Sequence, residues 1–198
     1  HMPDLAVPIA ELNGMSVDQS AIGSCTNSSY ADLKRVALML RDKRINPATD
    51  LFISPGSKQV MMLLAQEGLI EPMLESGARV LECTCGPCIG MGGSPVSGGV
   101  SARTFNRNFE GRSGTQDAKV YLVSPETAAQ AALNGSFTDP ATWGEPPARP
   151  SLPENPPSIR HLFVFPPEDG KGVEVKRGPN IVPLEQFPPL PEQLETTI

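Results

Sequence analysis

Cysteine spacing is the feature of this sequence that points most directly to chemistry. Three of the four cysteines, Cys83, Cys85 and Cys88, lie within six positions, and the fourth, Cys25, lies far upstream. Four thiolates would suit a structural zinc ion, and three would suit an iron–sulfur cluster with one iron left open. Buried cysteines can also act simply as small apolar side chains. The Gly-Pro turn between Cys85 and Cys88 aims both thiols at one point, which favours a metal centre of either kind.

Composition limits the compartment and the partners. Clustered cysteines do not suit the disulfide framework of a secreted domain, so we expect a reducing compartment and place the protein in the cytoplasm. The formal net charge of −6 argues against a surface for nucleic acid or anionic lipid. No apolar run approaches the roughly 20 residues needed to cross a bilayer. We therefore expect neither a membrane nor a nucleic acid as partner.

Strands and helices alternate in the elements that must position the cysteines. The apolar spacing predicts an α/β fold, a three-layer domain with a mainly parallel sheet flanked by helices. In such sheets, functional groups gather at the C-terminal ends of the strands, where both cysteine sites fall, so we expect them to meet. The predicted strands lie near residues 21–23, 51–53, 79–82, 98–102 and 119–123, and the predicted helices span 30–44, 58–67, 71–76 and 125–133.

The composition changes near Asp139. Most of the 22 prolines lie from Pro140 onward, and proline-rich chain is extended and lacks a core. We therefore predict an α/β domain over residues 3–138 and a proline-rich extension over 139–198. Within the extension, residues 161–165 and 173–175 flank a turn and predict a hairpin.

A basic segment follows the cysteines in this acidic chain. It contains Arg103, Arg107 and Arg112 within ten residues. The planar fork of arginine matches carboxylates with two hydrogen bonds. A basic surface loop with scattered salt bridges is the other interpretation. A structural zinc site does not account for such a segment, so it favours the iron–sulfur interpretation.

These residues carry a resemblance to a known family. The segments GSCTNS at 23–28, CGPCIG at 85–90 and NRNFEGR at 106–112 resemble three successive motifs of the aconitase superfamily, in order and approximate separation. Residues 54–57 resemble a further family segment, and residues 177–181 resemble the linker before the family's mobile C-terminal domain. The resemblance covers nearly the whole chain.

The resemblance implies a four-iron, four-sulfur cluster held by Cys25, Cys85 and Cys88. The fourth iron would have no protein ligand and would act as a Lewis acid on the substrate's hydroxyl and carboxylate. Cys83 departs from the family pattern, and we expect it to be a packed thiol beside the site. The other implied roles are Asn106, Ser24 and Asn27 beside the cluster, and Arg107 and Arg112 as ligands of a di- or tricarboxylate. The resemblance assigns no role to Arg103, for which we expect a salt bridge.

The resemblance also implies the reaction. We expect the cluster-binding domain of an aconitase-type hydro-lyase that isomerises citrate and isocitrate through cis-aconitate, and the form of residues 85–90 favours citrate. Homoaconitase or an isopropylmalate isomerase is the alternative within the superfamily. A structural zinc-binding or interaction domain is the alternative from another class, and RNA binding is the least favoured because of the acidic charge.

Histidine content sets a limit on what this chain can catalyse. Only His1 and His161 are present, whereas the family takes its proton-transferring groups and its catalytic serine from other domains. We therefore expect this chain to be the third of four domains and to be inactive alone. The other domains of the parent enzyme would then be its partners.

Overall fold

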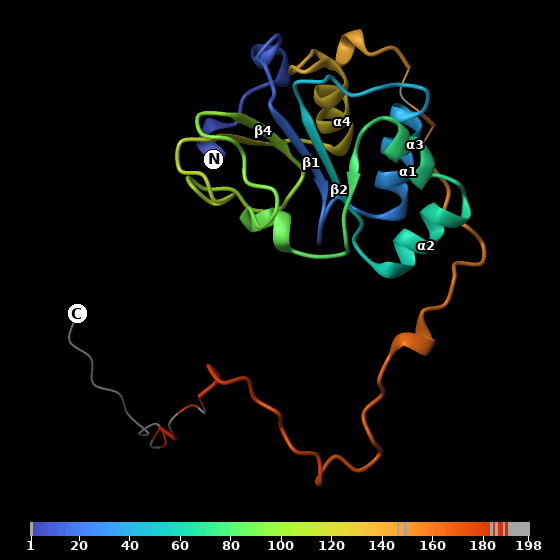
Figure 1. The fold of residues 1–198 in the computed structure, drawn as a ribbon, viewed down its shortest axis with the longest axis vertical. Coiled ribbons are helices and arrows are strands. Elements are labelled where there is room, and N and C mark those ends of the chain that lie inside the picture. Colours follow the sequence, from blue (N-terminus) through green and yellow to red (C-terminus); the bar gives the residue numbers. More distant parts are fainter. Residues whose placement is uncertain are drawn as a thin grey trace, which may run out of the picture. The chain divides into compact units, whose positions relative to one another are not determined.

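Five short strands pair into one parallel sheet in the computed structural model of the chain (Figure 1). The structure describes residues 2–145, 147–148, 150–182, 184, 186–187 and 189. The sheet has the order β3-β2-β1-β4-β5, and every neighbouring pair is parallel. Its strands are β1 (Gln19–Gly23), β2 (Asp50–Ser54), β3 (Arg79–Val80), β4 (Val100–Arg103) and β5 (Lys119–Leu122).

Local signals explain where the helices begin. Ser29 accepts a hydrogen bond from the backbone of Asp32, and the Asp32 side chain accepts one from the Ser29 backbone, which completes a capping box. Ser57 and Ser124 cap two more helices, and Pro125 follows Ser124 at the first helical position, where it costs no hydrogen bond. The four helices are α1 (Tyr30–Leu40), α2 (Lys58–Gln66), α3 (Ile70–Glu75) and α4 (Pro125–Asn134).

Strand order assigns each connection to a face of the sheet. The steps from β1 to β2 and from β2 to β3 run in one direction, whereas those from β3 to β4 and from β4 to β5 run in the other. Since parallel connections are right-handed, opposite directions place the connecting chain on opposite faces. Helices α1, α2 and α3 therefore share one face, and residues 81–99 and 104–118 cross the other.

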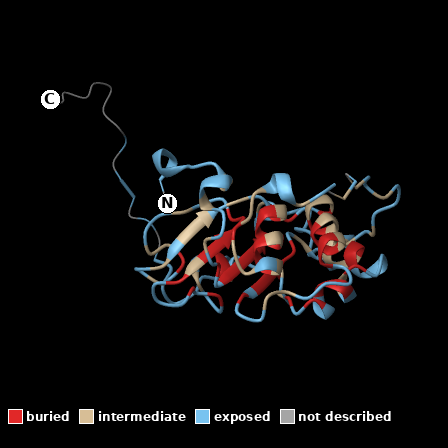
Figure 2. Cartoon of the chain, turned by 90° about the horizontal axis from the view of Figure 1, so that it is seen from above, coloured by how far each residue is buried: buried red, intermediate tan, exposed pale blue. Residues whose placement is uncertain are grey.

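The two faces have different cores. Alternate residues of β1 and β2, including Ile22, Leu51 and Ile53, are buried against α1, α3 and α4 in the main apolar cluster. On the other face, Ala21 and Phe52 pack with Cys88 and Phe105 from the connecting segments. Figure 2 shows the burial concentrated in the strands and the inward helix faces. The predicted three-layer α/β fold is confirmed, and its third layer is mostly irregular chain with a 3-10 turn at Gly86–Ile89.

Three predicted elements differ clearly from the structure. Helix α1 ends at Leu40 and not at residue 44, because Arg41 leaves the helical conformation and Asp42 has a φ of 59°. Strand β3 covers Arg79–Val80 and stops before residue 82, although Leu81 still donates a backbone bond to Ile53. The predicted hairpin does not form: residues 163–165 and 173–175 have no strand structure, and Arg160–Leu162 form a 3-10 turn. Its apolar side chains are exposed, and a two-stranded hairpin without a partner surface is marginal in water.

The chain divides into two units, up to His161 and from Leu162 onward. The first unit holds the sheet, all four α-helices and the segment 139–161, whose Pro157 carbonyl accepts a hydrogen bond from Gln59 at 2.8 Å. The second unit is irregular wherever it is described. None of the helices described is long and apolar enough to span a bilayer.

A polar contact between α1 and the end of α2 makes stability depend on pH. Lys34 donates to Glu67 at 2.6 Å, and the Tyr30 hydroxyl also donates to this carboxylate. These hydrogen bonds lower the pKa of Glu67. A lowered folded-state pKa stabilises the fold above the unfolded value of about 4.3, and this contribution is lost as pH falls through the folded value.

Glu67→Gln should therefore lower the free energy of unfolding by about 0.5–1 kcal/mol at pH 7, since the pair is partly exposed. The deficit should shrink between pH 7 and pH 3, because this contribution is lost as pH falls through the lowered folded-state pKa of Glu67. Urea unfolding at both pH values measures this, with the exposed Glu75→Gln as control. An equal deficit at both pH values would contradict the assignment.

Candidate functional site

The C-terminal ends of β1 and β4 lie side by side at the centre of the sheet. Connections leave these two strands in opposite directions, which is the arrangement that forms a crevice in open α/β sheets. Residues 24–27 follow β1 and residues 104–112 follow β4. The cysteine segment from residue 83 reaches the same edge after β3. Three of the motifs singled out in the sequence therefore meet at one edge of the sheet.

Hydrogen bonds join the loop after β1 to the loop after β4. Gly23 donates its backbone N–H to Thr104 Oγ1 at 2.8 Å, and the Asn27 amide donates to the Thr104 carbonyl at 2.6 Å. Ser24 and Asn27 both have positive φ, 73° and 50°, so the loop turns sharply on each side of Cys25. The Cys25 thiol then lies 4.0 Å from the Asn106 side-chain oxygen.

The cysteine segment is attached to the same loop. The Ser24 hydroxyl lies 3.5 Å from the Thr84 carbonyl, and Ser54 at the end of β2 donates to the Glu82 carbonyl at 3.0 Å. Thr84, which stands between Cys83 and Cys85 in the sequence, thus has its carbonyl next to the loop after β1. Cys83 is half-buried, and burial followed by the nearby Glu82 charge raises the pKa of its thiol.

The three thiols assigned to a cluster have different surroundings. Cys25 and Cys85 are exposed, whereas Cys88 is 8% exposed and packs on Ala21, Phe52 and Phe105. All four cysteines are free thiols. The buried Cys88 fixes its segment on the sheet, while Cys25 and Cys85 face solvent at the edge where the loops meet. Their assignment as cluster ligands stays a prediction.

The two candidate metal centres require different arrangements of the cysteine thiols. A single zinc ion needs its sulfur ligands at about 2.3 Å from one point. Within the described part of the chain, no group of three or more histidine, cysteine or acidic side chains is arranged to hold one ion. A four-iron cluster does not require that convergence, because each cysteine binds a different iron. Three thiols on joined loops are soft ligands of the type that iron–sulfur clusters take.

The arginines of the basic segment occupy different environments. Arg107 is exposed and makes no ion pair or hydrogen bond among the residues that the structure describes. The Arg112 guanidinium lies 3.6 Å from the Cys88 sulfur and 5.8 Å from the centre of the Phe109 ring. Arg107 is therefore available to a carboxylate in solution, while Arg112 sits against the cysteine segment. Neither placement tests the predicted contact with substrate.

Arg103 does not form the expected salt bridge. It is 1% exposed, and all its hydrogen-bond acceptors are neutral: Ser101, Gln19 and the carbonyls of Pro87 and Gly93. The sequence could not reveal this, because every acceptor is placed by the sheet or by the crossing segment. The only sequence signal was a charged residue directly after the strand predicted over residues 98–102.

Thr104 is a site residue that the sequence reading missed. It is 1% exposed, and its hydroxyl is the acceptor that joins β1 to β4 at their ends. Thr104→Val keeps the shape but leaves the buried Gly23 N–H unpaired, which should lower the free energy of unfolding by about 1–3 kcal/mol. Thr104→Ser keeps the hydroxyl and serves as the control in the same thermal or urea unfolding experiment. Equal stability of the valine variant and the wild type would show that this bond contributes little.

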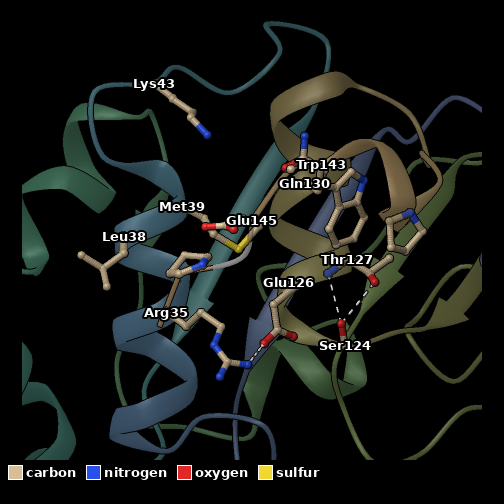
Figure 3. Close-up of a pocket in the computed structure, with 13 residues that line it drawn as sticks. Arg35, Leu38, Met39, Lys43, Ser124, Glu126, Thr127, Gln130, Trp143 and Glu145 are labelled. Atoms are coloured by element: carbon tan, nitrogen blue, oxygen red, sulfur yellow. Dashed lines mark hydrogen bonds and ion pairs between the residues drawn. The ribbon is translucent and has the colours of Figure 1, made fainter. Parts of the chain in front are cut away.

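A separate cavity lies on the helix face of the sheet (Figure 3). Its volume is about 470 Å³, and its walls come from α1, α4 and the segment after α4, including Met39, Thr127 and Trp143. Arg35 of α1 and Glu126 of α4 form an ion pair at its edge. None of the predicted site residues lines this cavity, so it is distinct from the cysteine edge.

The family of this chain is shown by its similarity to known proteins. The model of the aconitase family (aconitate hydratase) matches residues 6–135, more than half of the chain. The chain belongs to this family. The matched residues include the loops after β1 and β4 and the cysteine segment, so the resemblance of those three motifs is confirmed at the level of the family.

Curated relatives refine the comparison. The chain is 44% identical over 141 residues to the 3-isopropylmalate dehydratase large subunit of Elusimicrobium minutum, and 41% identical over 141 residues to that of Methanoregula boonei. The 3-isopropylmalate dehydratase large subunit 1 of Archaeoglobus fulgidus is also 44% identical over 141 residues. Each match covers 71% of this chain and 34% of the relative. The chain thus spans about a third of the length of the curated relatives it matches.

The relatives bear on the choice of substrate made from the sequence. Citrate was placed first on the form of residues 85–90, with isopropylmalate as the alternative. The relatives' names support the alternative better.

Proposed function

We propose that this chain is the cluster-bearing part of a hydro-lyase that isomerises 3-isopropylmalate or a close 2-hydroxy dicarboxylate. The observation that carries the proposal is the 44% identity over 141 residues to 3-isopropylmalate dehydratase large subunits, in a chain whose family match over residues 6–135 contains all three motifs. Citrate is the second candidate, supported by the family description alone.

The proposed cofactor is a four-iron, four-sulfur cluster on Cys25, Cys85 and Cys88. When bound, such a cluster supplies a Lewis-acidic iron that polarises a substrate hydroxyl. The chain's own contribution is to present the three thiols from two joined loops. Cys83 lies beside them as a half-buried thiol that is not a ligand. The Asn106 amide next to Cys25 would orient a ligand at this edge through its hydrogen-bonding groups.

Substrate binding is assigned to the basic segment. Arg107 is exposed and unpaired in the described structure, so its fork is free to take one carboxylate of a dicarboxylate. Arg112 lies against Cys88 and Phe109, where it would contact a carboxylate bound close to the cluster. The described residues offer no histidine at this edge, and the groups that move protons would come from other parts of the enzyme.

The partners follow from the same proposal. The relatives are named large subunits, so we expect a smaller subunit, together with the remaining part of a large subunit, to complete the active site. We therefore expect negligible turnover by this chain alone. Robust turnover by the purified chain would contradict the need for those parts.

Substrate choice is tested on a holoenzyme that contains this chain, the remaining part of the large subunit and a small subunit. After anaerobic reconstitution, kcat/KM is measured on 3-isopropylmalate and on citrate by the ultraviolet absorbance of the unsaturated intermediate. We expect a preference for 3-isopropylmalate of at least about a hundredfold, because a pocket built for one polar or apolar substituent rejects the other strongly. A preference for citrate would contradict the proposed substrate and favour citrate instead.

A further inference from the structure

Arg103 is a buried charge that the proposed chemistry does not use. Its side chain lies under the cysteine segment, on the face of the sheet that carries no α-helix. It is 1% exposed, and no carboxylate contacts it within the described residues. A buried, unpaired charge is costly, so a structure that keeps one needs compensation from hydrogen bonds.

The hydrogen bonds of Arg103 connect two layers. On the sheet side, Nε donates to Ser101 Oγ at 2.9 Å and Nη2 donates to Gln19 Oε1 at 2.6 Å. On the segment side, Nη1 donates to the Pro87 carbonyl at 2.7 Å and Nη2 donates to the Gly93 carbonyl at 2.5 Å. The guanidinium also lies 5.4 Å from the centre of the Phe105 ring. Four of its five donors are thus used to join the sheet to the segment.

The two carbonyls bracket the segment that carries Cys88. Pro87 precedes this cysteine directly and Gly93 follows it by five residues. The backbone between them is held by tight-turn bonds, such as Met91 N–H to Gly86 at 2.9 Å and Gly93 N–H to Gly90 at 3.1 Å. Such turns fix local shape but do not fix the segment's place on the sheet. That place depends on Arg103, on the small apolar contact of Cys88, on the Arg112 guanidinium 3.6 Å from the Cys88 sulfur, and on a hydrogen bond from Gln19 to the Ser94 carbonyl at 3.4 Å.

We propose that Arg103 is a positioning residue whose buried guanidinium holds residues 87–93 on the sheet so that Cys85 and Cys88 are preorganised for a cluster. The inference rests on the proposed function only for the identity of what is bound. Burial lowers the pKa of Arg103 to about 10, with the nearby Cys88 acting in the opposite direction, so the side chain stays charged at neutral pH. A negatively charged centre at this edge would also be attracted to it.

Hydrogen exchange of the metal-free chain tests the positioning role without any cluster. Arg103→Met removes the fork and keeps an apolar chain of similar length. We expect the amides of Gly90, Met91 and Gly93 to exchange at least about tenfold faster, while those of β1 and α1 keep wild-type rates. The control is Arg35→Met, which loses an ion pair on the opposite face of the sheet and should leave residues 90–93 unchanged. Wild-type exchange in residues 90–93 of a folded Arg103→Met chain would overturn the proposal.

Arg103→Lys covers the case in which the methionine variant fails to fold. Lysine keeps the charge, but its donors come from one nitrogen, which does not span two carbonyls and two side chains. We expect the amide exchange rates of residues 90–93 to increase less than in Arg103→Met, with no increase elsewhere. An increase spread evenly over α1 and β1, or none, would overturn the positioning role.

Iron and acid-labile sulfide content after reconstitution then separates the two proposals. If the wild-type chain takes up iron and sulfide and Arg103→Met takes up several-fold less, both stand. If the wild-type chain takes up zinc and no sulfide, the proposed cofactor is wrong, while the exchange result still decides the role of Arg103. If Arg103→Met loads as fully as the wild type despite loosened amides, preorganisation of the cysteines is refuted.

Discussion

Gly90→Ala is expected to abolish most cluster binding while the rest of the domain stays folded. Gly90 has φ of 86°, and a Cβ at this position would lie 2.1 Å from the Ser113 carbonyl oxygen. This is backbone, so the clash cannot be relieved by a side-chain rotation. It would push the cysteine segment away from the loop that carries Arg112. Since Gly90 lies outside the main apolar cluster, the helix face should remain intact.

Gly92→Ala is the matched control for this variant. Gly92 also has positive φ, 69°, but a Cβ there meets nothing within 4 Å. Both variants therefore carry the backbone strain of an alanine at positive φ, about 1–2 kcal/mol, and only Gly90→Ala adds a clash of about 1–3 kcal/mol. We expect iron and sulfide content after reconstitution to fall at least about tenfold for Gly90→Ala and to stay near wild type for Gly92→Ala. Equal loading of the two would show that the close approach of these loops does not matter for binding.

Gly23→Ala is expected to have the largest effect on stability of any single change discussed. Gly23 ends β1 with φ of 107°, and a Cβ would lie 2.0 Å from the Ser54 carbonyl oxygen and 3.3 Å from Ser28 Cβ. That carbonyl also accepts the Ser24 N–H at 2.8 Å. The clash would force apart two central strands where the cysteine loop begins. We expect a loss of more than about 4 kcal/mol in the free energy of unfolding, enough to prevent folding of a marginal domain.

Gly68→Ala is the control for Gly23→Ala, because it places an alanine at positive φ without a clash. Gly68 follows α2 with φ of 65°, and a Cβ there meets nothing within 4 Å. Its cost should be limited to about 1–2 kcal/mol of backbone strain. Soluble yield and urea unfolding of the two variants give the comparison. A Gly23→Ala chain as stable as Gly68→Ala would mean that the strand ends can separate without loss.

Local signals in the sequence carried much of the fold. Ser29, Ser57 and Ser124 cap helices through hydrogen bonds within one turn, so the starts of these helices depend on neighbouring residues alone. Parallel pairing followed from the alternation of strands and helices. The shortness of β3 did not, because an edge strand has one neighbour only and no local signal shows that pairing with it is limited to Arg79 and Val80.

The sequence predicted the motifs of the candidate site but not the hydrogen bonds that connect them. The cysteine and arginine segments were found by residue type and spacing. The roles of Thr104 and Arg103 depend on which strands become neighbours, and a charged residue inside a short strand gave no indication that its partners would be carbonyls from residues 87 and 93. For the substrate, the names of the relatives support isopropylmalate, the alternative, better than citrate.

The most direct test of the central claim is the iron and acid-labile sulfide content of the chain after anaerobic reconstitution. It should be measured on the wild type and on single alanine variants of Cys25, Cys83, Cys85 and Cys88. We expect iron and sulfide in equal amounts in the wild type and in Cys83→Ala, and loss of most of both in the other three variants. Zinc without sulfide, held by all four cysteines and lost in Cys83→Ala as well, would contradict the account.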